Sequence, residues 1–133
     1  MRHVLIEDYF KSLLDLLTPL PSVENPQVIF EKRAEMVGFI RGEITFTDGS
    51  MLHFRELVDL RQPMRTIMYA YHYQDSESAL IFRYDNTAHH MNVTTFPHHK
   101  HTADGNIVSV HEVPKLQDVL QEIEVLRLPS EEV

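Results

Sequence analysis

Apolar and polar residues alternate along this chain with two different periods. From Leu5 to Leu17 the apolar residues recur every three or four positions, which predicts an amphipathic helix that ends before Pro19 and Pro21. A second stripe of this kind follows Pro114, because proline is well placed at the first position of a helix, and it contains Leu116, Val119, Leu120 and Ile123. The sequence therefore predicts one helix near each end.

The central part of the chain has the pattern of β-strands. β-branched and aromatic residues alternate with polar ones there, and Asp48-Gly49 predicts a tight hairpin turn. The expected strands include Arg65–Gln74, Ala79–Asp85, Met91–Phe96 and Asn106–His111. The order of elements predicts an α+β fold: a single antiparallel, mostly meander β-sheet of about five to six strands, with an N-terminal and a C-terminal helix packed on it.

Length, charge and composition limit the possible functions. The chain has 133 residues, so we expect a single domain over 1–133 with a frayed tail from about residue 129. Its 12 basic and 20 acidic residues give a net charge of −8, so binding to nucleic acid needs a local cationic patch. The absence of cysteine excludes disulfides and thiolate sites, and no apolar run is long enough for a membrane span. We therefore expect a cytoplasmic protein that does not enter the membrane.

Histidines are concentrated in one segment, since six of the nine lie between His72 and His101. Imidazole titrates near neutral pH, so this segment can exchange protons, bind a metal or sense pH. A hairpin with its turn centred on Ser76-Glu77 makes His72 and Arg83 diagonal neighbours on one face. Guanidinium beside imidazole suits phosphate-ester chemistry, because one neutralises charge while the other moves protons. The alternative is that Arg83 forms only a surface ion pair with Asp85 or Glu77.

The segment F-P-H-H-K-H at residues 96–101 is the second candidate element. Proline cannot continue a central strand, so the residues after Pro97 should leave the sheet near its rim. Placed near His72 and Arg83, they would form a cationic patch. Neighbouring imidazoles disfavour each other's protonation, which leaves an acid and a base near pH 7. Such a pair can cleave RNA through its own 2′-hydroxyl without a metal.

Metal binding is the main competing interpretation. Three imidazole nitrogens and a carboxylate could bind zinc, nickel or copper, and the candidate ligands are Asp85, His89, His90, His98, His99, His101 and Asp104. Their spacing matches no common metal motif. Several of these histidines could also simply cap turns or be solvated.

Two segments resemble the TumE family. They are Y-H-Y-Q-D-x-x-x-x-L-I-F-R-Y-D-N-x-x-H-H at residues 71–90 and T-F-P-H-H-K-H at residues 95–101. Members of that family are regarded as the toxin halves of prokaryotic toxin–antitoxin pairs, acting as ribonucleases and silenced by an antitoxin. The resemblance implies an RNA substrate and a cognate antitoxin protein as a partner.

The expected site combines this resemblance with the chemistry of the residues. His72 or His98 is the expected general base, His99 or His101 the general acid, and Arg83 and Lys100 the phosphate-binding groups. Lesser candidates are Tyr84 for positioning, and His89 and His90 for substrate binding. We expect no cofactor and no metal. Acidic residues near the C-terminus would suit a basic antitoxin surface, and they are Glu122, Glu124, Glu131 and Glu132.

Three points stay open at this stage. The chain could be a histidine-rich metal-binding protein or a metal-dependent hydrolase. It could also be a non-catalytic interaction protein. Whether it forms a homodimer is open as well.

Overall fold

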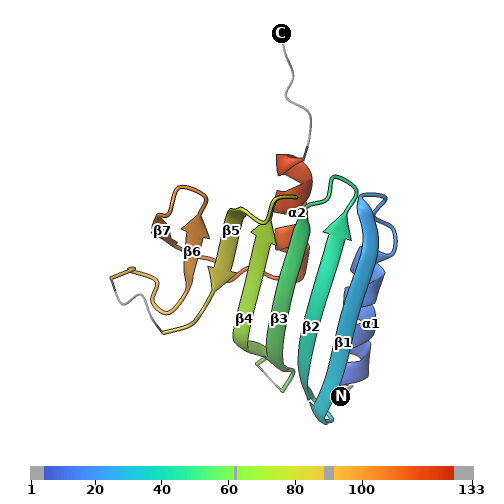
Figure 1. The fold of residues 1–133 in the computed structure, drawn as a ribbon. Coiled ribbons are helices and arrows are strands. Elements are labelled where there is room, and N and C mark those ends of the chain that lie inside the picture. The colour runs from blue at the N-terminus through green and yellow to red at the C-terminus, as the bar shows by residue number, and fades with distance from the viewer. Residues whose placement is uncertain (1–4, 62, 89–91, 128–133) are drawn as a thin grey trace.

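A computed structural model describes residues 5–61, 63–88 and 92–127 of the chain. In these residues seven strands form one antiparallel sheet, and every strand pairs with its neighbours in the sequence (Figure 1). The elements are α1 (Ile6–Leu17), β1 (Val23–Ala34), β2 (Val37–Phe46), β3 (Met51–Asp59), β4 (Arg65–Gln74), β5 (Leu80–Asp85), β6 (His99–Thr102), β7 (Ile107–Ser109) and α2 (Leu116–Leu126). The predicted α+β meander is confirmed, with seven strands rather than about five to six.

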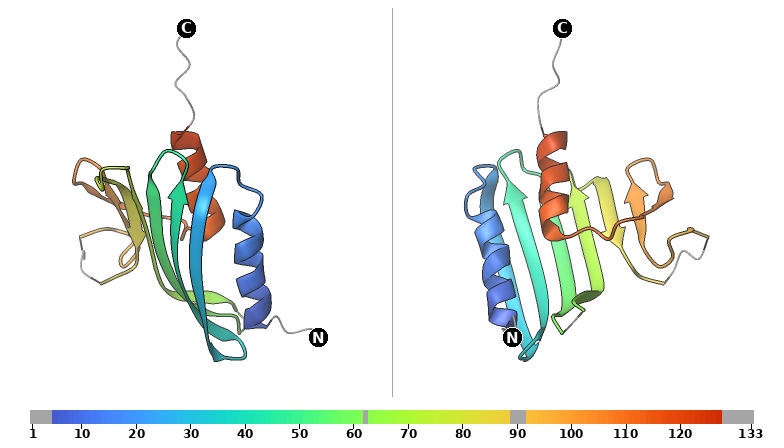
Figure 2. Two further views of the ribbon diagram at one scale, coloured as in Figure 1. Left: turned by 45° about the vertical axis from the view of Figure 1, so that its right-hand side comes forward. Right: turned by 180° about the vertical axis from the view of Figure 1, so that it is seen from behind.

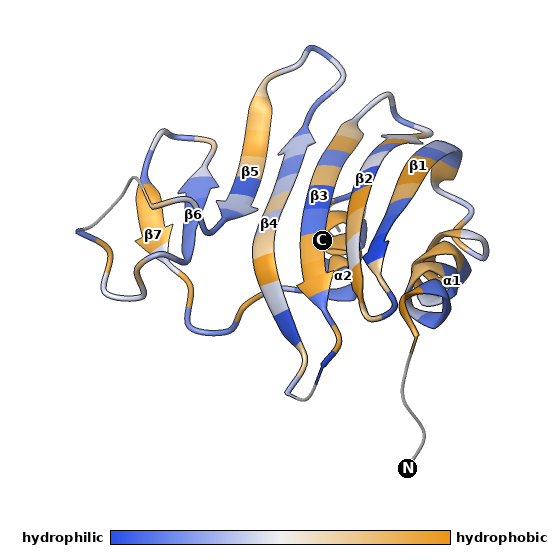
Figure 3. Ribbon diagram, turned by 90° about the horizontal axis from the view of Figure 1, so that it is seen from below, coloured by the Kyte–Doolittle hydropathy of each residue, from blue (hydrophilic) through white to orange (hydrophobic). Residues whose placement is uncertain are grey.

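Both helices pack on the same face of the sheet. Helix α1 lies over β1 and β2, and α2 lies over the middle strands (Figure 2). The opposite face, which we call the open face, has no helix on it (Figure 3). The core lies between the helices and the sheet, and its buried residues include Leu13, Leu17, Ile40, Ile44, Leu52, Val58, Tyr71, Tyr73, Phe82, Leu120 and Ile123.

Local hydrogen bonds fix the first turn of each helix. The carboxylate of Asp8 accepts a hydrogen bond from the backbone N–H of Leu5, and that of Asp118 accepts one from Lys115. An acidic side chain in the first turn satisfies a backbone donor that has no partner within the helix, and it interacts well with the helix dipole. Helix α1 ends at Leu17, before Pro19, as its sequence predicts.

The prediction of a strand at Met91–Phe96 is wrong. Residues 92–97 form turns, and the next strand is β6, which pairs with β5. Residues 99–102 therefore belong to the sheet rather than leaving it at the rim. Their sequence, His-Lys-His-Thr, has no apolar alternation that would mark a strand, so only the pairing with β5 identifies it. The predicted frayed tail from about residue 129 lies outside the described residues.

The hairpin of β4 and β5 has a different register from the predicted one. A turn centred on Ser76-Glu77 would pair Tyr73 with Leu80, whereas Tyr73 pairs with Phe82 and His72 directly with Arg83. The loop is longer than the predicted turn, because the Asp75 carboxylate accepts hydrogen bonds from the backbone N–H groups of Glu77 and Ala79. A shift by two residues leaves each side chain on its predicted face.

Candidate functional site

One row of side chains crosses the open face from β3 to β6. His53 pairs with His72 on the next strand, His72 pairs with Arg83, and Arg83 pairs with His101. We call these four residues the histidine–arginine row. Directly paired residues of adjacent strands point to the same face of a sheet, so the row brings together segments up to 48 positions apart (101 − 53 = 48).

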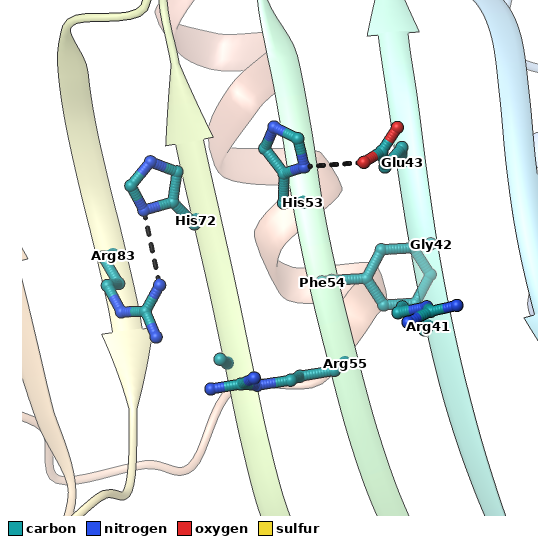
Figure 4. A pocket seen from close by; sticks show the side chains of 9 residues that line it. Arg41, Gly42, Glu43, His53, Phe54, Arg55, His72 and Arg83 are labelled. Atoms are coloured by element: carbon teal, nitrogen blue, oxygen red, sulfur yellow. Dashed lines mark hydrogen bonds and ion pairs between the residues drawn. The ribbon is translucent and has the colours of Figure 1, made fainter.

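Arg83 is held in place by its neighbours. Its Nε donates a hydrogen bond of 2.9 Å to Oδ2 of Asp85, and its Nη1 lies 3.4 Å from Nδ1 of His72 (Figure 4). A guanidinium can only donate hydrogen bonds, so this contact uses the lone pair of the imidazole. The arrangement directs the lone-pair nitrogen of His72 toward the guanidinium.

Asp85 joins the row to the two histidines of β6. It is 2 % exposed, and the backbone N–H and the hydroxyl of Thr87 both donate to its Oδ1. The same oxygen lies 2.9 Å from Nε2 of His99, and Oδ2 lies 3.6 Å from Nε2 of His101. Burial acts to raise the pKa of Asp85, but the hydrogen bonds from Thr87 and Arg83 outweigh it and lower the pKa. Asp85 is therefore an ionised carboxylate at neutral pH, and it orients the groups around it.

His72 has a pKa below its ordinary value. Partial burial is the largest cause, and the positive charge of Arg83 and the imidazoles of His53 and His101 lower it further. His72 is consequently neutral at pH 7 and able to accept a proton.

A hollow of about 230 Å³ lies beside the row on the open face, and its wall includes Arg41, Arg55, Ala70, His72 and Arg83. Arg41 and Arg55 are paired directly across β2 and β3, and both are exposed. Neither forms an ion pair with another residue in the described part of the chain, whereas Arg83 has Asp85. The hollow thus combines three guanidinium groups and the neutral imidazole of His72 with the carboxylate of Glu43, which lies beside His53.

Tyr84 and Lys100 lie on the helix-covered face of the sheet. The hydroxyl of Tyr84 donates a 2.6 Å hydrogen bond to Glu122 of α2, and the ammonium of Lys100 lies 2.8 Å from the same carboxylate. These contacts attach α2 to β5 and β6. The structure therefore does not bring the two residues to the face that carries His72 and Arg83.

The remaining predicted site residues have three different locations. His101 lies in the row, whereas His99 is only 1 % exposed, and its Nδ1 donates a 2.8 Å hydrogen bond to the carbonyl of Pro97. His98 stacks on Tyr69, whose side chain belongs to the core, and lies 3.0 Å from its hydroxyl. The predicted substrate-binding residues His89 and His90 are outside the described residues.

Sequence reasoning missed three members of this face: His53, Arg41 and Arg55. The hairpin of β2 and β3 did not give this pairing from the sequence. A two-residue Asp48-Gly49 turn would place Arg41 opposite Glu56, whereas the observed loop has three residues, Thr47 to Gly49, and places Arg41 opposite Arg55.

Comparison with known proteins agrees with the family resemblance that residues 71–90 and 95–101 carry. The family model described as toxin TumE matches residues 11–127. The chain belongs to the TumE toxin family. No curated protein and no solved structure matches it. The match begins within α1 and extends through the end of α2, so it includes all seven described strands of this TumE-family chain. Neither described helix is long and apolar enough to cross a membrane.

Proposed function

We propose that this TumE-family toxin is a metal-independent ribonuclease of the cytoplasm and that the histidine–arginine row is its active site. The observation that supports this most is the position of Arg83 between His72 and His101 on one open surface. Neighbouring strands are about 4.8 Å apart, so the two histidines flank the guanidinium at a spacing of roughly 10 Å between Cα atoms. A phosphodiester bound at Arg83 has an imidazole on each side.

The chemistry follows from the state of each group. When the phosphodiester binds Arg83 and replaces its hydrogen bond to His72, neutral His72 removes the proton of the RNA 2′-hydroxyl, and the resulting oxygen attacks the adjacent phosphorus. Arg83 stabilises the negative charge that develops on the phosphorane. The bond to the 5′-oxygen breaks, and His101, whose Nε2 lies 3.6 Å from the Asp85 carboxylate, gives a proton to the leaving oxygen. The products are a 2′,3′-cyclic phosphate and a 5′-hydroxyl.

The geometry supports His72 and His101 over the other predicted acid–base candidates. His98 stacks on a core tyrosine, and His99 is almost completely buried beside Asp85. A group that exchanges protons with a polymer has to reach the surface, as His72 and His101 do. His99 and Asp85 then act as positioning residues.

We propose a cognate antitoxin as the protein partner, which follows from membership of a toxin family. Helices α1 and α2 carry six acidic residues and a single lysine between them, in agreement with a basic surface on that partner.

Cleavage of RNA by the purified full chain in the presence of EDTA tests the proposal. We expect His72→Gln, His101→Gln and Arg83→Gln each to lower the rate by about 100-fold or more, because each removes an acid–base or charge-stabilising group. His111→Asn, which changes an exposed histidine outside the row, is the matched control and should keep full activity. Detection of 2′,3′-cyclic phosphate termini identifies the mechanism. Full activity in the three row variants would reject the assignment.

A metal-binding function is the second candidate, and a specific triad supports it. One ligand atom each from Asp85, His99 and His101 lies within 4.8 Å of the others. The hydrogen bond from His99 Nδ1 to a carbonyl is typical of metal-binding histidines, because it orients Nε2 toward the metal. Against it, Arg83 places a positive charge on the same carboxylate. Elemental analysis of protein purified without a histidine tag distinguishes the two: near-stoichiometric zinc, together with activity lost in EDTA, would favour the metal.

A further inference from the structure

Arg41 and Arg55 form a second anion site on the open face. We infer that they bind a backbone phosphate of the RNA one or more nucleotides away from the bond that is cut. This inference rests on the proposed ribonuclease function, because it assigns to the same substrate a contact outside the histidine–arginine row.

The pairing of these two arginines concentrates positive charge on the open face. Like charges directly opposite each other on neighbouring strands destabilise a sheet. The nearest carboxylate on the same face of β2 is Glu43, and it lies 3.4 Å from His53 rather than at either guanidinium. Among the described residues, then, two exposed guanidinium groups face the same side without a carboxylate between them. The guanidinium of Arg55 lies over β4 and that of Arg41 over β2 (Figure 4), so the two offer neighbouring positions for backbone phosphates, and arginine is well suited to bind a phosphate with two parallel hydrogen bonds.

The position of Arg55 connects this pair to the proposed active site. Its side chain extends from β3 over β4, on the side of Arg83 (Figure 4). Arg55 and Ala70 are direct partners across β3 and β4, and the short side chain of Ala70 leaves the hollow open at this point. A chain of phosphates can therefore pass from Arg83 to Arg55 without crossing a bulky side chain.

The surface continues in the same direction beyond Arg41. A second hollow of about 280 Å³ lies on the other side of this residue, between β1 and β2, and Arg41 lines both hollows. Its wall includes Ile29, which is 57 % exposed. An exposed apolar side chain next to a cation provides contact for a base or ribose beside a bound phosphate. The path thus runs from β5 to β1 across the strands.

The substrate class follows from this path. A dinucleoside monophosphate has one phosphate, which the active site uses, so it has no second phosphate for Arg41 and Arg55. A longer RNA strand contacts both sites. The arginine pair should therefore favour RNA chains of several nucleotides over the smallest cleavable unit.

The experiment separates binding from cleavage. Binding of a 2′-O-methylated octanucleotide, which cannot be cut, is measured by fluorescence anisotropy over a range of salt concentrations. The double variant Arg41→Gln/Arg55→Gln should bind it about tenfold more weakly, and the slope of log affinity against log salt should fall by at least about 0.7, the value for one lost phosphate contact on a single strand. Lys11→Gln, on the exposed side of α1, is the control for a lost positive charge and should leave affinity and slope unchanged.

Cleavage gives the second readout. In the double variant kcat/KM should fall about tenfold for a cleavable octanucleotide and by less than about twofold for a dinucleoside monophosphate, since the lost contact contributes only to binding of the longer chain. An unchanged affinity and salt slope, or equal losses on both substrates, would overturn the second site. If the wild-type chain binds the octanucleotide through these arginines but cuts no RNA, the ribonuclease proposal fails and the arginine site stands.

Discussion

At the scale of single residues, the protonation of His72 decides whether the row can act as proposed. Burial and the charge of Arg83 keep its pKa below the ordinary value of 6.5. A general base must be neutral, so lowering its pKa extends activity into more acidic solution. We therefore expect the acidic limb of the pH–rate profile to lie below pH 6.5.

Replacing Arg83 tests the electrostatic part of this account. Arg83→Gln removes a positive charge 3.4 Å from the imidazole, so the pKa of His72 should rise toward 6.5. Burial, which is the larger cause of the lowered pKa, remains in the variant, so the pKa of His72 should rise only part of the way to 6.5. NMR titration of the His72 ring protons measures the change directly. Arg33→Gln, far along β1, should not move the titration, and a His72 pKa unchanged in Arg83→Gln would contradict the argument.

At the scale of elements, the contact between β2 and β3 depends on a glycine. A Cβ at Gly42 would lie 2.2 Å from the ring of Phe54, which covers this position from the next strand. Gly42→Ala should therefore lower the free energy of unfolding by about 1–3 kcal/mol, the usual cost of overpacking. Chemical denaturation measures the loss. Combining it with Phe54→Leu should recover part of the stability, and a double variant with strictly additive losses would show that the two residues do not conflict.

The elements also show which parts of the fold the sequence alone predicts. Both helices and the β4–β5 hairpin have clear periodic patterns, and so the approach of His72 to Arg83 could be predicted. β6 could not, because four polar residues form a strand only by pairing with β5. This pairing has a second consequence: alternation along β6 sends His99 and His101 to the open face and Lys100 to the helices. A patch that needed all three together was therefore geometrically impossible.

At the scale of the whole molecule, one buried carboxylate links the two layers. Glu56 on β3 is 1 % exposed, and it accepts hydrogen bonds from Tyr9 of α1 and Tyr71 of β4. No cation of the described residues pairs with it. Burial raises the pKa of Glu56, although both tyrosines act to lower it. Glu56 is therefore protonated more readily in the folded protein than in the unfolded chain.

The sign of the pH dependence follows from this shift. The pKa of Glu56 in the folded protein is above the ordinary value of 4.5. The contribution of neutral Glu56 to stability is therefore fully present below pH 4.5, and it is lost as the pH rises through the pKa of Glu56 in the folded protein. Glu56→Gln, which stays neutral, should be more stable than the wild type at pH 7, by about 1.4 kcal/mol for each pH unit of the shift. Urea denaturation at a series of pH values tests this. Glu24→Gln at an exposed position is the control, and a difference between Glu56→Gln and wild type that does not grow with pH would contradict it.

The meander has a consequence for the chain during its synthesis. Since each strand pairs with the one made just before it, β2 to β5 can assemble while the ribosome is still adding residues. At that stage the surface already carries Arg41, Arg55, His72 and Arg83, but not His101, the proposed proton donor. Under the proposed function, the nascent chain would therefore bind RNA before it could cut it.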